Sequence, residues 1–214
     1  MKLQVAFDMP DLQEALSLAE SIHQYADVIE VGSLLLYQYG TEAIRQFRSR
    51  IPLKSILADM KIVDRGREAS KIGLLAGADW VTVLAGTSKT VIHTTCNAAH
   101  ELGKKVMLDL IDSSSLGESA LESKSLGVDA LLFHKPTDDK DAKLLVLEQW
   151  DMVRGNTTLP IFISAPVTRD TISSVIELRP EGIVLGKVIT ESNDPVSEII
   201  YLRRLAGLSE LSSR

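Results

Sequence analysis

Residues 57–64 read Leu-Ala-Asp-Met-Lys-Ile-Val-Asp and close an apolar run that begins near Ser55. The run predicts a buried β-strand, and its polar end predicts a site. Because side chains alternate along an extended chain, Asp59 and Lys61 should lie on the same face of the sheet. Buried charges are costly unless they pair with each other or with a ligand. Taken alone, an exposed strand end with a surface salt bridge would explain the same pattern.

Apolar or β-branched runs of this kind recur along the chain at nearly even spacing. Segments with helical periodicity lie between them, as in residues 12–22, 72–76 and 172–176. Gly77 and Gly127 each end such a segment and return the chain to a strand, as glycines in left-handed helix caps do. The predicted strands are residues 3–7, 27–31, 54–58, 80–84, 105–110, 130–133, 160–164 and 182–185.

Eight strands alternating with eight helices predict a parallel sheet, which can be open and doubly wound or closed. Eight nearly equal units in 214 residues favour a (β/α)8 TIM barrel that forms one domain over residues 1–214. A dinucleotide-binding fold is disfavoured because no Gly-x-Gly-x-x-Gly follows the first run.

Catalytic groups in such barrels gather at the C-terminal ends of the strands. Each polar residue found there also has a structural explanation. Asp8 could cap the first helix, although Asp11 is better placed for this, and a lone histidine after a strand is more often a core residue. Their joint occurrence at strand ends favours a functional site. The residues are Asp8, Glu30, Asp59, Lys61, Asp64, Asp109, His134, Gly186 and Lys187.

Composition and charge argue against several classes of function. The chain is 45% hydrophobic and 24% charged, which suits a globular domain with a sizeable core. A net charge of -6 without a basic cluster argues against a nucleic-acid surface. No membrane-spanning run or secretory signal is visible, so we expect a cytoplasmic protein. The single cysteine, Cys96, lies in a helical pattern and is expected to be structural.

Four motifs carry a family resemblance. The most specific is Asp-x-Lys-x-x-Asp, met by Asp59, Lys61 and Asp64; the others lie at residues 3–8, 29–33 and 77–84. With them the chain resembles the orotidine-5'-monophosphate decarboxylase superfamily from Leu3 to about Leu205. Within it, the chain is most similar to the branch of 3-hexulose-6-phosphate synthases and 3-keto-L-gulonate-6-phosphate decarboxylases.

Asp8 is a candidate for substrate binding, and the resemblance implies roles for the other strand-end residues. Glu30 and Asp59 would bind Mg2+, which would hold a ribulose-5-phosphate-like sugar phosphate and stabilise an enediolate. Lys61 would add a cation, and His134 would shuttle a proton. Asp109 stands where the synthases carry aspartate and the decarboxylases typically carry glutamate. Asp64 would reach the neighbouring subunit's site, which implies a homodimer with shared active sites.

The phosphate-binding positions depart from the family pattern. The family uses Gly-Gly after the seventh strand, where this chain has Ala165-Pro166, and Gly-Arg or Gly-Ser after the eighth, where it has Gly186-Lys187. Proline has no N–H to donate, so at least one expected hydrogen bond to phosphate is missing. Thr137 replaces an arginine of the decarboxylases. Residues 139–143 read Asp-Lys-Asp-Ala-Lys, where family members tend to have small residues and a glycine after the aspartate.

Three functions are compatible with this pattern. The first is a Mg2+-dependent aldolase that condenses formaldehyde with ribulose 5-phosphate, which Asp109 and Thr137 favour. The second is a sugar-phosphate decarboxylase that uses the same enediolate. The third is a non-catalytic sugar-phosphate-binding homologue with a degraded phosphate site.

Overall fold

The structure is a computed structural model that describes residues 1–136, 146–209 and 211. Its strands are β1 (Lys2–Phe7), β2 (Val28–Val31), β3 (Ser55–Ile62), β4 (Trp80–Leu84), β5 (Lys105–Asp109), β6 (Ala130–His134), β7 (Ile161–Ser164) and β8 (Gly182–Leu185). Each strand pairs in parallel with the next, and β8 pairs with β1 to close the barrel. The closed barrel confirms the predicted (β/α)8 fold.

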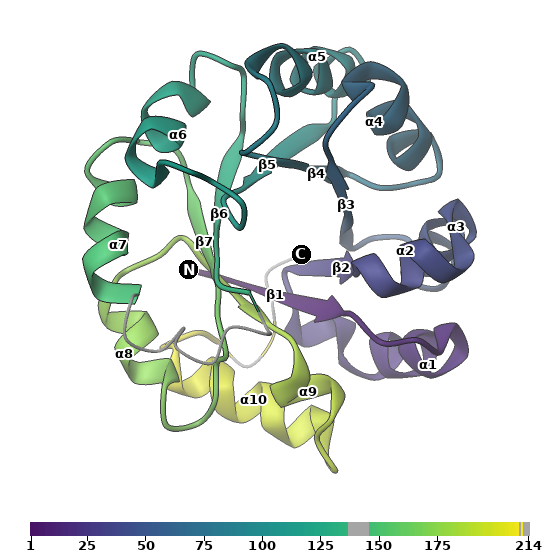
Figure 1. Ribbon diagram of the computed structural model, residues 1–214. Coiled ribbons are helices and arrows are strands. Elements are labelled where there is room, and N and C mark those ends of the chain that lie inside the picture. The colour runs from purple at the N-terminus through teal and green to yellow at the C-terminus, as the bar shows by residue number, and fades with distance from the viewer. Residues whose placement is uncertain (137–145, 210, 212–214) are drawn as a thin grey trace.

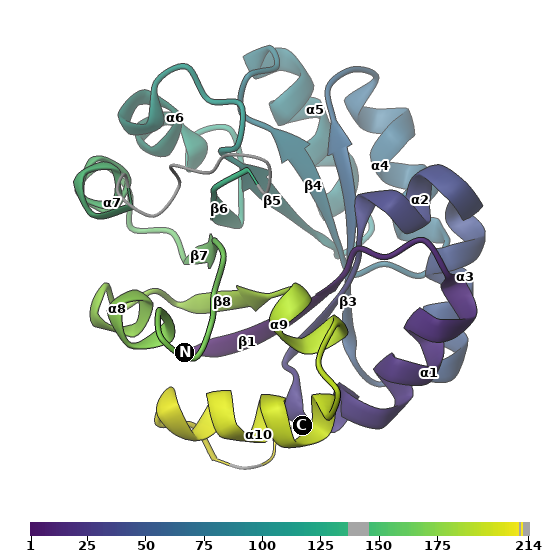
Figure 2. The same ribbon diagram turned by 60° about the horizontal axis from the view of Figure 1, so that its bottom comes forward.

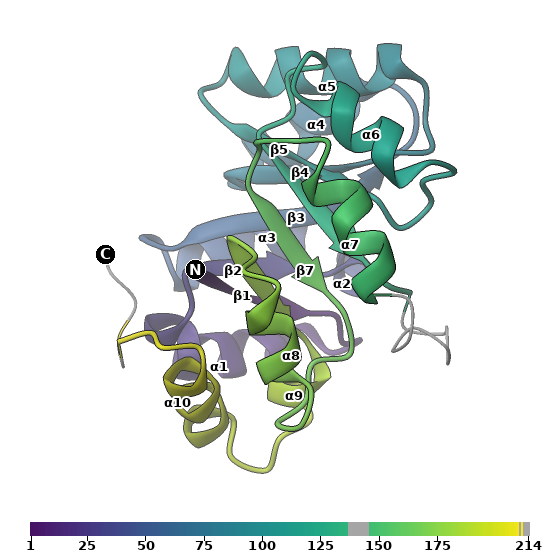
Figure 3. The same cartoon turned by 90° about the vertical axis from the view of Figure 1, so that its left-hand side faces the viewer.

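Helices surround the barrel on all sides (Figure 1 and Figure 2). The side view in Figure 3 shows α10 next to α1, so the last helix closes the ring against the first. The helices are α1 (Leu12–Ile22), α2 (Ser33–Tyr39), α3 (Thr41–Arg50), α4 (Gly66–Leu75), α5 (Lys89–His100), α6 (Leu116–Ser123), α7 (Val146–Arg154), α8 (Ile172–Glu177), α9 (Lys187–Thr190) and α10 (Pro195–Leu205), with a 3-10 turn, η1 (His23–Tyr25).

The helices differ from the prediction of one per strand. Two helices, α2 and α3, connect β2 to β3, and the short α9 precedes α10. Gly40 separates α2 from α3 because its φ of 58° lies in the left-handed region, which glycine adopts at little cost. Gly77 and Gly127 have φ of 120° and 90°, so their predicted role at helix ends is confirmed.

Side chains on the two faces of the strands form two cores. Outward-facing residues such as Val5 and Phe7 are fully buried against the helices, and the Phe7 ring lies 5.4 Å from that of Phe47 in α3. Inward-facing residues such as Leu57 and Phe162 fill the barrel. A Cβ on Gly182 would lie 2.2 Å from the Phe162 ring, so this position must lack a side chain. The interior is therefore packed, and the open strand ends are left for chemistry.

Within the described residues, no helix has both the length and the apolar character needed to cross a membrane.

Candidate active site

Five of the predicted site residues converge at the C-terminal ends of neighbouring strands. Glu30, Asp59 and Asp109 lie at the ends of β2, β3 and β5 as buried carboxylates, while Lys61 and His134 are half-buried. Lys61 Nζ lies 2.9 Å from Asp59 Oδ2 and 3.0 Å from Asp109 Oδ2. His134 Nδ1 lies 2.9 Å from Asp109 Oδ2. We call Glu30, Asp59, Lys61, Asp109 and His134 the strand-end cluster.

A bulge in β3 sets the position of Lys61. The sequence predicted a regular strand ending at residue 58, but β3 continues to Ile62. Ala58 pairs with Val81, and the next pair is Ile62 with Val83, so three residues of β3 lie opposite one residue of β4. Lys61 has a φ of 44°, which costs a side-chain-bearing residue about 1 kcal/mol or more. Bulges of this kind redirect side chains next to active sites.

Asp59 is held by two hydroxyl groups that sequence reasoning missed. Ser33 Oγ donates to Asp59 Oδ2 at 2.6 Å, and Thr82 Oγ1 donates to Oδ1 at 2.9 Å. Ser33 begins α2, and Thr82 faces inward from β4. Both residues are neutral. They lie inside the motifs at residues 29–33 and 77–84, but nothing in those motifs assigned either side chain a role. Together with Lys61 they satisfy the buried carboxylate.

Glu30 is the least compensated carboxylate of the strand-end cluster. Within the described residues it accepts one hydrogen bond, from Nε2 of the fully buried Gln4 at 2.6 Å. Burial and the nearby charge of Asp59 raise the pKa of Glu30 to about 8, although the Gln4 hydrogen bond opposes this. Gln4 was also missed, because an amide inside a β-strand carries no charge signal.

Asp109 links the lysine to the histidine and stays ionised despite full burial. Desolvation acts to raise its pKa, but the hydrogen bonds from His134 and Lys61, together with the charge of Lys61, outweigh this and lower it. Burial likewise acts to lower the pKa of Lys61, and Asp59 and Asp109 raise it instead. Lys61 is therefore a permanent cation held between two anions.

Asp8 and Asp64 lie outside the strand-end cluster. Exposed Asp8 accepts the backbone N–H of Leu34 at 2.8 Å and so binds the start of α2, while Asp11 caps α1 by accepting from Glu14 N. Exposed Asp64 accepts the N–H of Arg65 at 2.7 Å. Neither aspartate completes the cluster from within the same chain.

Comparison with known proteins agrees with this geometry. The model of the orotidine 5'-phosphate decarboxylase / HUMPS family matches residues 1–200. The chain belongs to this family. A relative in Bacillus subtilis (strain 168), 3-hexulose-6-phosphate synthase, is 28% identical over 206 residues, covering 96% of this chain and 98% of the relative.

Solved structures of family members superimpose over nearly the whole chain. 3-Hexulose-6-phosphate synthase from Salmonella typhimurium has a TM-score of 0.91 at 31% identity, covering 96% of this chain and 98% of its own. 3-Keto-L-gulonate-6-phosphate decarboxylase from Vibrio cholerae has a TM-score of 0.81 at 23% identity, covering 96% and 97%, and shows the shared fold. The family relationship indicates an enzyme of the lyase type.

The loop after β7 uses its backbone N–H donors internally. The N–H of Val167 donates to the carbonyl of Ala165 at 2.7 Å, and the N–H of Thr168 donates to Thr171 Oγ1 at 2.8 Å. Pro166 has no N–H, so the donors at 166–168 are absent or engaged within the loop. Thr137 and residues 139–143 lie outside the described residues.

The loop after β8 is more open to an anion. Gly186 precedes the short helix α9, and a Cβ placed on it would meet nothing within 4 Å. Lys187 is exposed, and its Nζ lies 3.4 Å from Glu191, a surface pair of little energetic weight. The lysine can therefore turn toward a bound anion at little cost.

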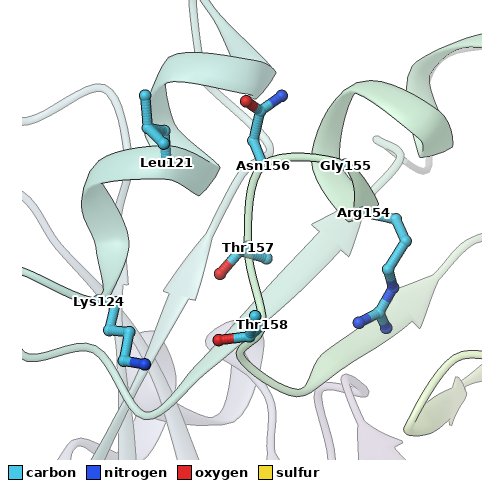
Figure 4. A pocket seen from close by; sticks show the side chains of 7 residues that line it. All are labelled: Leu121, Lys124, Arg154, Gly155, Asn156, Thr157 and Thr158. Atoms are coloured by element: carbon cyan, nitrogen blue, oxygen red, sulfur yellow. The ribbon is translucent and has the colours of Figure 1, made fainter.

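A separate hollow of about 430 Å³ lies between the end of α6 and the loop that leads from α7 into β7 (Figure 4). It is lined by Leu121, Lys124, Arg154, Gly155, Asn156, Thr157 and Thr158. None of the predicted site residues lines it, and Arg154 is paired with Glu181 at 2.5 Å. We therefore place the chemistry at the strand-end cluster. Cys96 takes no part in it, because burial raises the pKa of its thiol to about 12.

Proposed function

We propose that this protein is a Mg2+-dependent aldolase of the 3-hexulose-6-phosphate synthase type, which condenses formaldehyde with ribulose 5-phosphate. Two observations support the proposal: the strand-end cluster, and relatives named 3-hexulose-6-phosphate synthase at 28% and 31% identity over nearly the whole chain. The Asp109–His134 pair is the observation that carries it.

Asp109 prepares His134 for proton transfer. The carboxylate beside Nδ1 favours the tautomer in which Nδ1 carries the proton, which leaves the Nε2 lone pair for the substrate. We infer that Nε2 accepts a proton from the hydroxymethyl carbon next to the ketone of ribulose 5-phosphate. This carbon then bonds to the carbon of formaldehyde as the C=O π bond breaks, and the proton on Nε2 passes to the alkoxide oxygen that results. The fixed charge of Lys61 would stabilise the negative charge that develops on the substrate oxygens.

Glu30 and Asp59 are the proposed holders of Mg2+. No group of three or more His, Cys, Asp or Glu side chains suited to a metal occurs in the described part of the chain. Two carboxylates are nevertheless enough for Mg2+, which keeps several waters and takes oxygens from the substrate. The donor set fits, because Glu30 is a buried carboxylate whose one hydrogen bond from the described residues comes from a neutral amide. When bound, the ion would act as a Lewis acid on substrate oxygens.

We place the substrate phosphate near Gly186 and Lys187. Ala165 and Pro166 would flank it without offering the N–H donors of a Gly-Gly pair, because that loop uses its donors internally. One missing charge-assisted hydrogen bond weakens binding by about tenfold or more. The cation of Lys187 would offset part of that loss.

We further propose a homodimer in which Asp64 of each chain enters the partner's site. Asp64 is exposed and separate from the strand-end cluster of its own chain, as a shared residue would be. Analytical ultracentrifugation tests the dimer. Asp64→Asn should lower turnover while leaving the sedimentation coefficient unchanged, and a monomeric, fully active enzyme would refute sharing.

Formaldehyde consumption tests the proposed reaction. The purified protein is assayed with ribulose 5-phosphate and Mg2+, with and without chelator. Chelator-sensitive consumption supports the aldolase and shows that Ala165-Pro166 is tolerated. Carbon dioxide release from 3-keto-L-gulonate 6-phosphate would assign the decarboxylase instead. A folded protein that does neither, but is thermally stabilised by a sugar phosphate, would be a binding homologue.

A further inference from the structure

Thr82 is the single residue of β4 that lies opposite the bulge of β3. Its neighbours Val81 and Val83 pair with Ala58 and Ile62, which leaves Thr82 facing residues 59–61. The two valines belong to the outer core beneath the helices, so Thr82 points into the barrel, where it is fully buried. Its hydroxyl is the only polar group of its side chain.

This hydroxyl makes two hydrogen bonds, one to each end of the bulge. The backbone N–H of Lys61 donates to Thr82 Oγ1 at 2.8 Å, and Oγ1 donates to Asp59 Oδ1 at 2.9 Å. A hydroxyl has one proton to donate. Since its contact with the Lys61 N–H uses oxygen as an acceptor, that proton is free for the carboxylate. The Lys61 N–H thus finds its partner in a side chain opposite the bulge.

We propose that Thr82 is a positioning residue of the active site, whose hydroxyl couples the left-handed backbone of Lys61 to the orientation of Asp59. It would fix two groups at once: the carboxylate proposed to bind Mg2+ and the lysine proposed to face the substrate. Its expected effects on turnover and on Mg2+ affinity rest on the proposed function, whereas its expected effect on exchange of the Lys61 amide rests on the geometry alone.

Removing the hydroxyl while keeping the shape of the side chain tests this role. Thr82→Val leaves the Lys61 N–H and one Asp59 lone pair without partners, whereas Thr82→Ser keeps both hydrogen bonds. Thr95→Val is the matched control: Thr95 is also fully buried, but it lies in the outer helix α5, where its Oγ1 donates to the carbonyl of Val91.

Three readouts are expected to change in Thr82→Val only. The kcat for formaldehyde consumption falls about tenfold or more, because a hydrogen bond to a charged group has been removed. The affinity for Mg2+, measured by thermal shift, falls by a similar factor. Hydrogen exchange of the Lys61 amide, followed by mass spectrometry, becomes faster. Thr82→Ser stays within about threefold of wild type, and Thr95→Val changes none of the three.

A Thr82→Val protein with wild-type kcat and Mg2+ affinity would overturn the proposal. Equal losses in Thr82→Ser and Thr82→Val would also overturn it, because the hydroxyl would then not matter. If Thr82→Val does not fold, Thr82→Ala against Thr82→Ser makes the same comparison. If the wild-type protein proves inactive, the proposed function fails separately, and exchange of the Lys61 amide still decides: an unchanged rate in Thr82→Val refutes the coupling.

Discussion

Replacing Asp109 by asparagine removes the charge on which the strand-end cluster is centred. Asp109 is fully buried and accepts from Lys61 Nζ at 3.0 Å, from the Ile111 N–H at 3.0 Å and from the ring of His134 at 2.9 Å. The side-chain amide of asparagine keeps one acceptor oxygen, but its NH2 group would face Lys61 or His134, which are donors themselves. At least one charge-assisted hydrogen bond, of about 1.5–3 kcal/mol, is lost.

The expected loss of stability is about 3 kcal/mol, at the low end for breaking a buried ion pair, because Lys61 keeps Asp59 as a partner. For a chain of this size, that lowers Tm by about 6–12 °C. The sign of the pH dependence follows from the lowered pKa of Asp109. A lowered pKa stabilises the fold above the ordinary aspartate pKa of about 3.9, and this stability is lost as the pH falls through the folded value. The wild type and Asp109→Asn should therefore begin to converge as the pH falls below about 4, and should be equally stable only below the folded pKa of Asp109.

Urea denaturation in metal-free buffer at pH 7 and at acid pH measures both effects. Asp129→Asn is the matched control. Asp129 also accepts from a backbone N–H, that of Val106, and its carboxylate lies 3.0 Å from Nε2 of His100. This pair lies nearer the surface, because the His100 side chain is 43% exposed. It should lose no more than about 1 kcal/mol. Formaldehyde consumption should fall by about 10²–10⁴ in Asp109→Asn alone, since His134 loses its orienting carboxylate. Equal losses of stability in the two variants at pH 7 would refute the reasoning.

Three further predictions follow from the same geometry. The pKa of Glu30 is raised to about 8, so the metal-free native state holds a proton that the unfolded chain releases. The free energy of unfolding should therefore fall as the pH rises from about 5 to 8. Glu30→Gln should flatten this slope in urea titrations. Asp59→Ala should abolish Mg2+-dependent turnover with an unchanged circular dichroism spectrum, since the site is peripheral to core packing; wild-type turnover would contradict it. The double variant Ala165→Gly/Pro166→Gly should lower KM for the sugar phosphate by about tenfold, and an unchanged KM would exclude this loop from phosphate binding.

The barrel could be predicted because its signal is repeated in every unit. β-Branched runs at even spacing set the strands, and glycines such as Gly77 and Gly127 set the helix ends. The two extra helices near β2 and β8 were missed because they are short and lie next to longer periodic segments. Their apolar residues do not show a helical periodicity of their own that the sequence could reveal.

The charged residues of the site were predicted, and the neutral residues that hold them were not. Glu30, Asp59, Asp109 and His134 stand out because charge at the end of a buried strand needs an explanation. Thr82 and Gln4 are ordinary residues of a strand until the register shows which face they occupy. The bulge of β3 was also unpredictable, because its stabilising bond joins a side chain to the backbone of a neighbouring strand.

The charges of the strand-end cluster support the proposal that it holds a divalent cation. Without metal, Lys61 lies between the carboxylates of Asp59 and Asp109 and balances one of them, and Glu30 avoids adding a further negative charge by keeping its proton up to a pH of about 8. Ionising Glu30 leaves two uncompensated negative charges, which is the charge that one Mg2+ neutralises. Metal binding should therefore release a proton near neutral pH, and the affinity for Mg2+ should rise as the pH approaches 8. Calorimetry in buffers of different ionisation enthalpy measures that proton, and release that persists undiminished in Glu30→Gln would locate it on another group.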